Sequence, residues 1–348
     1  MNSSAAAINA LLNWYESAKR TLPWRADRDP YHVWVSEIML QQTRVETVIP
    51  YYQRFLAAFP DVRALAEAPD EQLLKLWEGL GYYSRVRNMK KAAQQIESEF
   101  GGQFPQDRAR LQKLAGIGPY VSGAIASIAF EQPAPAVDGN VLRVVARWTA
   151  DPDDIAQPAM RRKTEAFVAA HMPAGRCGMF TQALMELGAC VCVPNGAPHC
   201  TECPLQPDCA AFATGRTRTL PVKSRAKPRK IEERTVLLFQ SGEKFALRCR
   251  PAKGLLAGLW ELPSLDGHWT TEQLAQRYGR ILTEPPEPMG HARHIFTHIE
   301  WRMTGFRLTV YDPSALPDAA WFTADEIRTQ LSVPTAFAPY MAQIRPKT

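Results

Sequence analysis

Residues 114–120 of the chain read Leu-Ala-Gly-Ile-Gly-Pro-Tyr, and residues 137–140 read Val-Asp-Gly-Asn. Gly116 and Gly118 predict a tight turn in which the backbone adopts positive φ angles. Pro119 then begins a helix, at the position where its missing N–H group costs nothing. Backbone N–H groups in such a turn, next to a helix N-terminus, can hold an anion such as a DNA phosphate. A turn of this kind more often only joins two helices, so the phosphate role of Gly116 and Gly118 needs support from the rest of the chain.

The sequence on both sides of this turn predicts a region of helices. Apolar residues recur there at helical spacing, and capping residues or glycines stand at the ends of the segments. The predicted helices cover residues 4–19, 30–40, 44–58, 70–78, 82–99, 107–113, 119–130, 139–149, 158–171 and 176–190. No segment before residue 230 alternates as a strand does, so we expect a mainly α N-terminal region.

The chain changes character after a basic stretch. Residues 216–234 contain eight Lys and Arg residues against two Glu residues. Further along, strand-like segments occur at 236–239, 245–247, 259–262, 291–295 and 299–310, and helical segments at 271–278 and 323–330. We therefore expect a mainly α region at 1–215, a basic linker at 216–230 and a smaller α+β domain at 231–348.

The composition bounds the class of protein. Hydrophobic residues make up 46% and charged residues 22% of the chain, as in a globular protein. The net charge of +6 equals the excess in the basic stretch, which is either a solvated linker or a segment that lies along a phosphate backbone. The apolar residues 5–12 are too few for a signal peptide or a membrane span. We expect a cytoplasmic protein with no membrane partner.

The cysteines point to a metal site. Cys192, Cys200, Cys203 and Cys209 follow the spacing C-x7-C-x2-C-x5-C. Four thiolates in one short loop can bind zinc or a [4Fe–4S] cluster, and the spacing does not decide between them. Cys190 could compete with Cys192 as a ligand. The two other cysteines, Cys177 and Cys249, are expected to be small buried hydrophobic residues.

Glu37 and Asp138 form a candidate pair of catalytic carboxyl groups. Glu37 is followed by Ile38, Met39 and Leu40, so we expect loss of hydration to raise its pKa and keep it protonated near neutral pH. Asp138 precedes a predicted helix and could simply be its N-cap. Cleavage of a glycosidic bond needs one carboxyl group to protonate the leaving group and another to stabilise the cationic sugar.

Several motifs together resemble one family over almost the whole chain. These motifs are WVSEIMLQQT at 34–43, GLGYY at 79–83, the turn at 114–120, VDGNV at 137–141 and the cysteine loop at 192–209. In this order they are similar to the MutY family of adenine DNA glycosylases, within the helix-hairpin-helix glycosylase superfamily. The resemblance implies a [4Fe–4S] cluster on the four cysteines. It also implies base excision repair as the process and double-stranded DNA as the substrate, with adenine opposite 8-oxoguanine or guanine.

The resemblance also implies roles for individual residues. Glu37 would protonate the departing adenine, and Asp138 would stabilise the sugar cation or form a transient adduct, assisted by Tyr120 and Asn140. Residues implied to contact the adenine or the bases around the lesion are Trp24, Arg25, Leu40, Gln42, Thr43, Tyr82 and Glu186. Among these, Gln42 and Tyr82 would push into the base stack, as proteins that extrude a base do.

The position of Tyr120 implies the type of reaction. Relatives that resemble endonuclease III carry a lysine there, which forms a Schiff base and cuts the strand. Tyrosine cannot form that intermediate, so we expect a monofunctional glycosylase.

The C-terminal domain resembles the MutT-like, or Nudix, domain of the same family. Residues 254–263 read GLLAGLWELP, which matches the family pattern, but the Glu-rich metal-binding helix of true Nudix hydrolases does not follow. The domain is therefore expected to read the damaged base rather than hydrolyse nucleotides. The candidate reading residues are Phe296, Thr297 and His298.

The chain departs from the family pattern in three places. Thr297 stands where the family usually has serine, which adds a methyl group next to the hydroxyl. The first two cysteines have seven residues between them instead of six, and Leu142 stands where some members have lysine. The first departure bears on recognition of the lesion.

The sequence thus predicts a monomeric adenine DNA glycosylase of the cytoplasm and nucleoid. Three alternatives remain from the sequence alone: an endonuclease III-like glycosylase and lyase, a non-enzymatic DNA-binding protein with a metal loop, and a Nudix hydrolase with a helical appendage.

Overall fold

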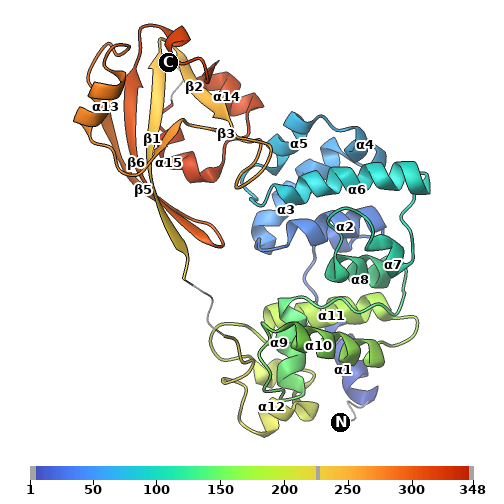
Figure 1. The fold of residues 1–348 in the computed structure, drawn as a ribbon. Helices are drawn as coiled ribbons and strands as arrows, with labels where there is room; N and C mark the ends of the chain where they lie inside the picture. Colours follow the sequence, from blue (N-terminus) through green and yellow to red (C-terminus); the bar gives the residue numbers. More distant parts are fainter. Residues whose placement is uncertain (1–4, 225–227, 345–348) are drawn as a thin grey trace. The chain divides into compact units, whose positions relative to one another are not determined.

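A computed structural model describes residues 5–224 and 228–344 (Figure 1). Residues 225–227 of the predicted linker lie outside the described residues. The chain forms two compact units. The first contains the described parts of Met1–Ala68 and Arg87–Arg225, and the second those of Pro69–Val86 and Ala226–Thr348.

The first unit is helical in all its regular structure within the described residues. Its helices are α1 (Ala5–Ala18), α2 (Pro30–Met39), α3 (Val45–Ala58), α4 (Val62–Glu67), most of α6 (Ser84–Phe100), α7 (Arg108–Leu111), α8 (Pro119–Ile128), α9 (Gly139–Trp148), α10 (Pro158–His171), α11 (Cys177–Cys190) and α12 (Ala210–Ala213). Short 3-10 turns occur at Pro23–Arg25, Cys200–Glu202 and Gln206–Asp208. The predicted helices are confirmed here to within three residues at each end, and α10 matches at both ends.

Two helices that carry the site are almost wholly buried. In α2, Asp29 is the N-cap, its side chain accepting a hydrogen bond from the backbone N–H of Tyr31, and Pro30 takes the first helical position. Every residue of α2 from Val33 to Met39 is buried, as is every residue of α8 from Val121 to Ile128. A helix that is apolar all round sits inside a protein, so a polar side chain on α2 enters an environment with little water.

The turn before α8 needs glycine at one of its two positions. Gly116 adopts a φ of +73°, and a Cβ atom there would lie 2.7 Å from Cβ of Asn88. Gly118 has a φ of −87° and is the N-cap of α8, with open space where its Cβ would be. The prediction that both glycines require positive φ is therefore wrong for Gly118. Its backbone only has to be extended before Pro119.

The second unit is built on a mixed sheet with helices. Its strands are β1 (Lys230–Ser241), β2 (Lys244–Cys249), β3 (Trp260–Glu261), β4 (Ser264–Asp266), β5 (Glu287–Ile295), β6 (Ile299–Thr309) and β7 (Ala320–Thr323). The order along the sheet is β3-β2-β1-β6-β5, with β4 paired to β1 and β7 to β2. The pair of β1 and β6 is parallel, and the other pairs are antiparallel. The unit also contains α5 (Asp70–Trp77), α13 (Thr271–Tyr278), α14 (Ala324–Gln330) and α15 (Ala338–Met341).

The two faces of this sheet bury separate cores. On one face Trp301, Met303 and Tyr340 belong to a cluster with α14 and α15. On the other, Leu237, Phe239 and Leu308 pack with Leu274 of α13. The alternation of buried side chains along β1 and β6 follows from the two-residue period of a strand. The expected α+β domain is confirmed, whereas α4, α12, α15, β4 and β7 were not predicted.

No helix among the described residues is long and apolar enough to cross a membrane.

Candidate active site

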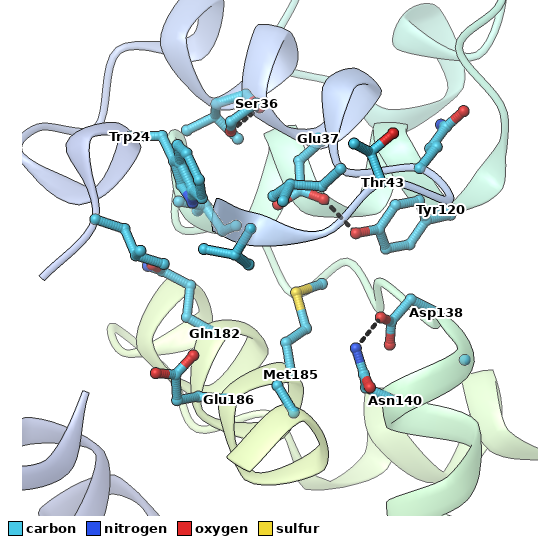
Figure 2. Close-up of a pocket in the computed structure, with 18 of the residues that line it drawn as sticks. Trp24, Ser36, Glu37, Thr43, Tyr120, Asp138, Asn140, Gln182, Met185 and Glu186 are labelled. Atoms are coloured by element: carbon cyan, nitrogen blue, oxygen red, sulfur yellow. Dashed lines mark hydrogen bonds between the residues drawn. The ribbon is translucent and has the colours of Figure 1, made fainter. Parts of the chain in front are cut away.

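A cavity of about 560 Å³ lies in the first unit, among α2, α8, α9 and α11. Figure 2 shows its lining, with Glu37 on one side and Asp138 and Asn140 on another. Predicted site residues that line the cavity are Trp24, Arg25, Glu37, Leu40, Gln42, Thr43, Tyr120, Asp138, Asn140 and Glu186. These residues come from segments far apart in the sequence, and the packing of four helices brings them to one place.

Glu37 is a buried carboxyl group on the apolar helix α2. Its side chain is 7% exposed and accepts a hydrogen bond from the hydroxyl group of Tyr120 on α8. Loss of hydration is the largest influence and raises the pKa of Glu37 to about 7, against the opposite effect of the Tyr120 hydrogen bond. The nearby Asp138 raises it further. Glu37 can therefore carry a proton near neutral pH, as predicted from the sequence.

Asp138 serves as the N-cap of α9 and also faces the cavity. Its carboxylate accepts hydrogen bonds from the backbone N–H of Val141 at 2.8 Å and from Nδ2 of Asn140 at 2.7 Å. Burial raises its pKa, while these hydrogen bonds and the charge of Arg143 oppose the rise by favouring the anion. The two interpretations of Asp138 left open by the sequence are thus both compatible with its position.

Arg143 holds Asn140 in place and was missed by the sequence analysis. Its side chain is buried and donates to Oδ1 of Asn140, to the carbonyl of Gly188 and to the carbonyl of Cys192, each at 2.7 Å. Because Oδ1 of Asn140 is engaged in this way, its Nδ2 points to Asp138. A charged residue inside the apolar run Val141–Val145 is a signal that could have identified Arg143.

Glu186 on α11 is a fixed anion at the end of the cavity. Its carboxylate accepts from Nε of Arg20 and from Nη2 of Arg25, both at 2.8 Å, and it is 1% exposed. Burial raises its pKa, but the hydrogen bonds and charges of the two arginines outweigh this and lower the pKa to about 2. The cavity therefore contains one carboxyl group that can carry a proton near neutral pH, Glu37, and one that is ionised there, Glu186. Arg20 was not predicted, since nothing in its sequence neighbourhood marks it.

Gln42 and Trp24 also line the cavity. Gln42 has a φ of +61°, a conformation that costs free energy for a residue with a side chain. Trp24 is buried and packs edge-on against Tyr52, with ring centroids 5.5 Å apart. Both positions are compatible with their predicted roles.

The remaining predicted base contacts belong to the second unit. Tyr82 has a φ of +48° and is 46% exposed. Its hydroxyl group lies 2.7 Å from Oγ1 of Thr297, so a hydrogen bond joins them. Phe296 packs on Trp301, with ring centroids 4.8 Å apart, and this contact fixes the base of the 296–298 loop.

The cysteine loop forms a second, small cavity. Cys192, Cys200, Cys203 and Cys209 all line it, together with His199 and Arg147. Nη1 of Arg147 lies 3.2 Å from Sγ of Cys192. Among the described residues, no three Cys, His, Asp or Glu side chains are placed to hold a single metal ion. The structure thus brings the four predicted cysteines to one small cavity.

The three cysteines outside the proposed ligand set differ in their exposure to solvent. Cys177 is buried, as expected, but Cys249 is exposed at the end of β2. The expectation for Cys249 is wrong because the last two residues of β2 lie outside the buried part of the strand. Cys190 is partly buried and does not line the cavity of the other four.

Comparisons with known proteins show which families and relatives the chain resembles. Residues 35–170 match the HhH-GPD superfamily of base excision DNA repair proteins, and residues 234–343 match the NUDIX domain. The chain is 37% identical to adenine DNA glycosylase of Rattus norvegicus, over 91% of this chain and 74% of that protein. It is 36% identical to the adenine DNA glycosylase of Homo sapiens, over 92% and 70%. A solved thermostable thymine-DNA glycosylase is similar with a TM-score of 0.54 and 26% identity, covering 60% of this chain and 95% of that one.

Proposed function

Because this chain belongs to the MutY family, the adenine DNA glycosylases of base excision repair, we propose that Glu37 and Asp138 catalyse its reaction. The substrate we propose is double-stranded DNA with adenine opposite 8-oxoguanine, or opposite guanine. The observation that carries the proposal is one cavity lined by both carboxyl groups: Glu37, whose pKa burial raises to about 7, and Asp138, whose carboxylate accepts hydrogen bonds from Asn140 and Val141.

The reaction needs adenine to leave the helix, because its glycosidic bond is buried within the duplex. Glu37 gives its proton to a ring nitrogen of the adenine. The bond between C1′ and N9 then breaks, with its electron pair going to the base. The carboxylate of Asp138 stabilises the positive charge that develops on the sugar, and Asn140 and Arg143 keep that carboxylate in position. Water adds to C1′ and loses a proton, which leaves an abasic site.

Tyr120 supports a monofunctional enzyme. Its hydroxyl group is engaged with Glu37, and a phenol cannot form the Schiff base that a lyase requires. We propose that Arg25, Leu40 and Glu186 contact the adenine, with Trp24 beside them. Thr43 lines the same cavity.

Further residues are proposed to act on the base stack and on the base opposite the adenine. We propose that Gln42 and Tyr82 enter the base stack and that Phe296, Thr297 and His298 read the 8-oxoguanine. The hydrogen bond between Tyr82 and Thr297 supports this proposal, because it joins a proposed wedge residue to a proposed reading residue within the second unit. Gly116 and Gly118 are proposed to bind a DNA phosphate through backbone N–H groups.

We also propose that Cys192, Cys200, Cys203 and Cys209 hold a [4Fe–4S] cluster. A bound cluster supplies cross-linking of the loop and a capacity for one-electron transfer. Arg147 would donate a hydrogen bond to one of its sulfur ligands. We further propose a monomer of the cytoplasm and nucleoid, with a division into residues 1–215, 216–230 and 231–348.

Single-turnover excision tests the assignment. A duplex with adenine opposite 8-oxoguanine is incubated with the protein, and strand breaks are measured with and without alkali. We expect breaks only after alkali, and no covalent complex on treatment with borohydride. A borohydride-trapped complex would show instead a glycosylase and lyase of the endonuclease III type.

A further inference from the structure

Three arginines line the catalytic cavity: Arg20, Arg25 and Arg161. Arg20 and Arg25 are both neutralised by Glu186, the first at Oε1 and the second at Oε2. Within the described residues, Arg161 has no carboxylate partner. Arg161 is therefore the cavity arginine whose charge is available to a ligand.

The position of Arg161 places this charge at the edge of the cavity. Arg161 lies in the first turn of α10 and is exposed, so it is not part of the buried core. Its Nη1 donates a hydrogen bond to the carbonyl of Val137, the residue before Asp138. A guanidinium group has five N–H donors in a rigid plane, and this bond uses one of them. The bond thus anchors the group beside Asp138 and leaves donors for an anion.

The substrate supplies the anion that suits such a group. A nucleotide extruded from the duplex rotates about its backbone and stays covalently linked to the phosphates on either side, so these phosphates have to pass close to the pocket that holds the base. Arginine binds phosphate through paired hydrogen bonds that match its planar geometry. We propose that Arg161 binds a phosphate next to the extruded adenosine, an inference that rests on the proposed function of this cavity.

A purely structural role of Arg161 has to be distinguished from phosphate binding. Through Val137, Arg161 could act only by holding the backbone at Asp138. That role would change the excision rate but would not change how binding depends on salt. A phosphate contact, in contrast, changes the salt dependence, because each contact releases counterions from the DNA.

The experiment compares Arg161→Ala, Arg161→Lys and Arg162→Ala. Arg162 is a matched control, since it is the next residue on α10, has the same charge, is exposed and does not line the cavity. All three are made in a Glu37→Gln background, in which excision is blocked and the duplex stays intact. Affinity for a duplex with adenine opposite 8-oxoguanine is measured against salt concentration. A second set of duplexes carries a neutral methylphosphonate on either side of the adenosine.

We expect Arg161→Ala to weaken binding about tenfold and to lower the salt slope by about 0.9, with Arg161→Lys in between. A methylphosphonate on one side should weaken binding of the Glu37→Gln protein by a similar factor and have no further effect on Arg161→Ala. Equal effects of Arg161→Ala and Arg162→Ala would overturn the proposal. The proposal would also be overturned if a methylphosphonate, on either side of the adenosine, weakened binding of Arg161→Ala as much as it weakens binding of the Glu37→Gln protein. Excision by the wild-type protein is measured in parallel, and its absence would instead remove the proposed function itself.

Discussion

The hydroxyl group of Tyr120, on α8, donates a hydrogen bond to Oε2 of Glu37, on α2. Both groups lie where two buried helices meet at the cavity that we propose as the active site. Burial raises the pKa of Glu37 to about 7, and the Tyr120 hydrogen bond limits the rise. The pair therefore sets the pH range over which the acid is protonated.

The rate of excision should fall as the pH rises through about 7, because we propose that Glu37 acts in its protonated form. Above that pH the protonated fraction decreases about tenfold per pH unit. Tyr120→Phe removes a hydrogen bond that lowers the pKa, so the falling limb should move to higher pH. Tyr311→Phe, which removes an exposed hydroxyl group in the second unit, should leave the profile unchanged. Single-turnover rates of the two variants and the wild type are measured between pH 5 and 9. A fall in rate that begins at lower pH in Tyr120→Phe than in the wild type would contradict the account.

Glu186→Gln should destabilise the first unit by about 2–4 kcal/mol, because it leaves Arg20 and Arg25 without their anion. In the wild type the pKa of Glu186 is lowered to about 2, so the contribution of the pairs is present at neutral pH and is lost as the pH falls towards 2. Arg63→Gln is a control, since Arg63 is 74% exposed and 3.8 Å from Glu97, and it should cost less than about 0.5 kcal/mol. Urea denaturation at pH 7 compares the free energies of unfolding of the two variants. Equal losses would show that the buried ion pairs of Glu186 stabilise the protein no more than an exposed one.

Gly116→Ala and Gly118→Ala should differ in stability. Gly116 has a positive φ and would place a Cβ atom against Asn88, whereas Gly118 has neither constraint. We expect a loss of about 1–3 kcal/mol for Gly116→Ala and well under 1 kcal/mol for Gly118→Ala. Thermal unfolding followed by circular dichroism measures the difference. Loss of the same size in both variants would mean that the turn requires two glycines after all.

Cys203→Ser should reduce the iron content and the brown absorbance of the purified protein, because it removes one proposed ligand. Cys190→Ser should retain both, since Cys190 does not line the cavity of the four cysteines. Cys249→Ser is an exposed control. Metal analysis of the three variants beside the wild type decides this. Zinc in place of iron in the wild type would refute the proposed cluster.

The sequence predicted the parts of the site whose signal is local. Glu37 stands out as a carboxyl group in an apolar helix, and the cysteine spacing marks the loop. The partners of these residues are brought in by tertiary packing, so Arg20 carries no signal that could be read from its neighbours. The resemblance to a family named Tyr120 and Asn140, but only the structure shows which atoms they contact.

The secondary structure, too, could be predicted only where the signal in the sequence is local. Helices with a clear apolar period were predicted to within a few residues, whereas α4 and α12 are too short to show a period. The strands β4 and β7 contain three and four residues and are fixed by pairing with β1 and β2. Short elements of this kind are stabilised by their neighbours in the sheet, which the local sequence does not reveal.

The most direct test of the central claim is excision of adenine opposite 8-oxoguanine by Glu37→Gln and Asp138→Asn, beside wild type and Glu131→Gln. Glu131 lies outside the cavity and pairs with the exposed Arg28, so its variant controls for the loss of a carboxylate. We expect both cavity variants to bind the duplex while their single-turnover rates fall by at least about 10²-fold, and Glu131→Gln to excise adenine at close to the wild-type rate. Excision at the wild-type rate by either cavity variant would contradict the assignment of these two carboxyl groups as the catalytic pair.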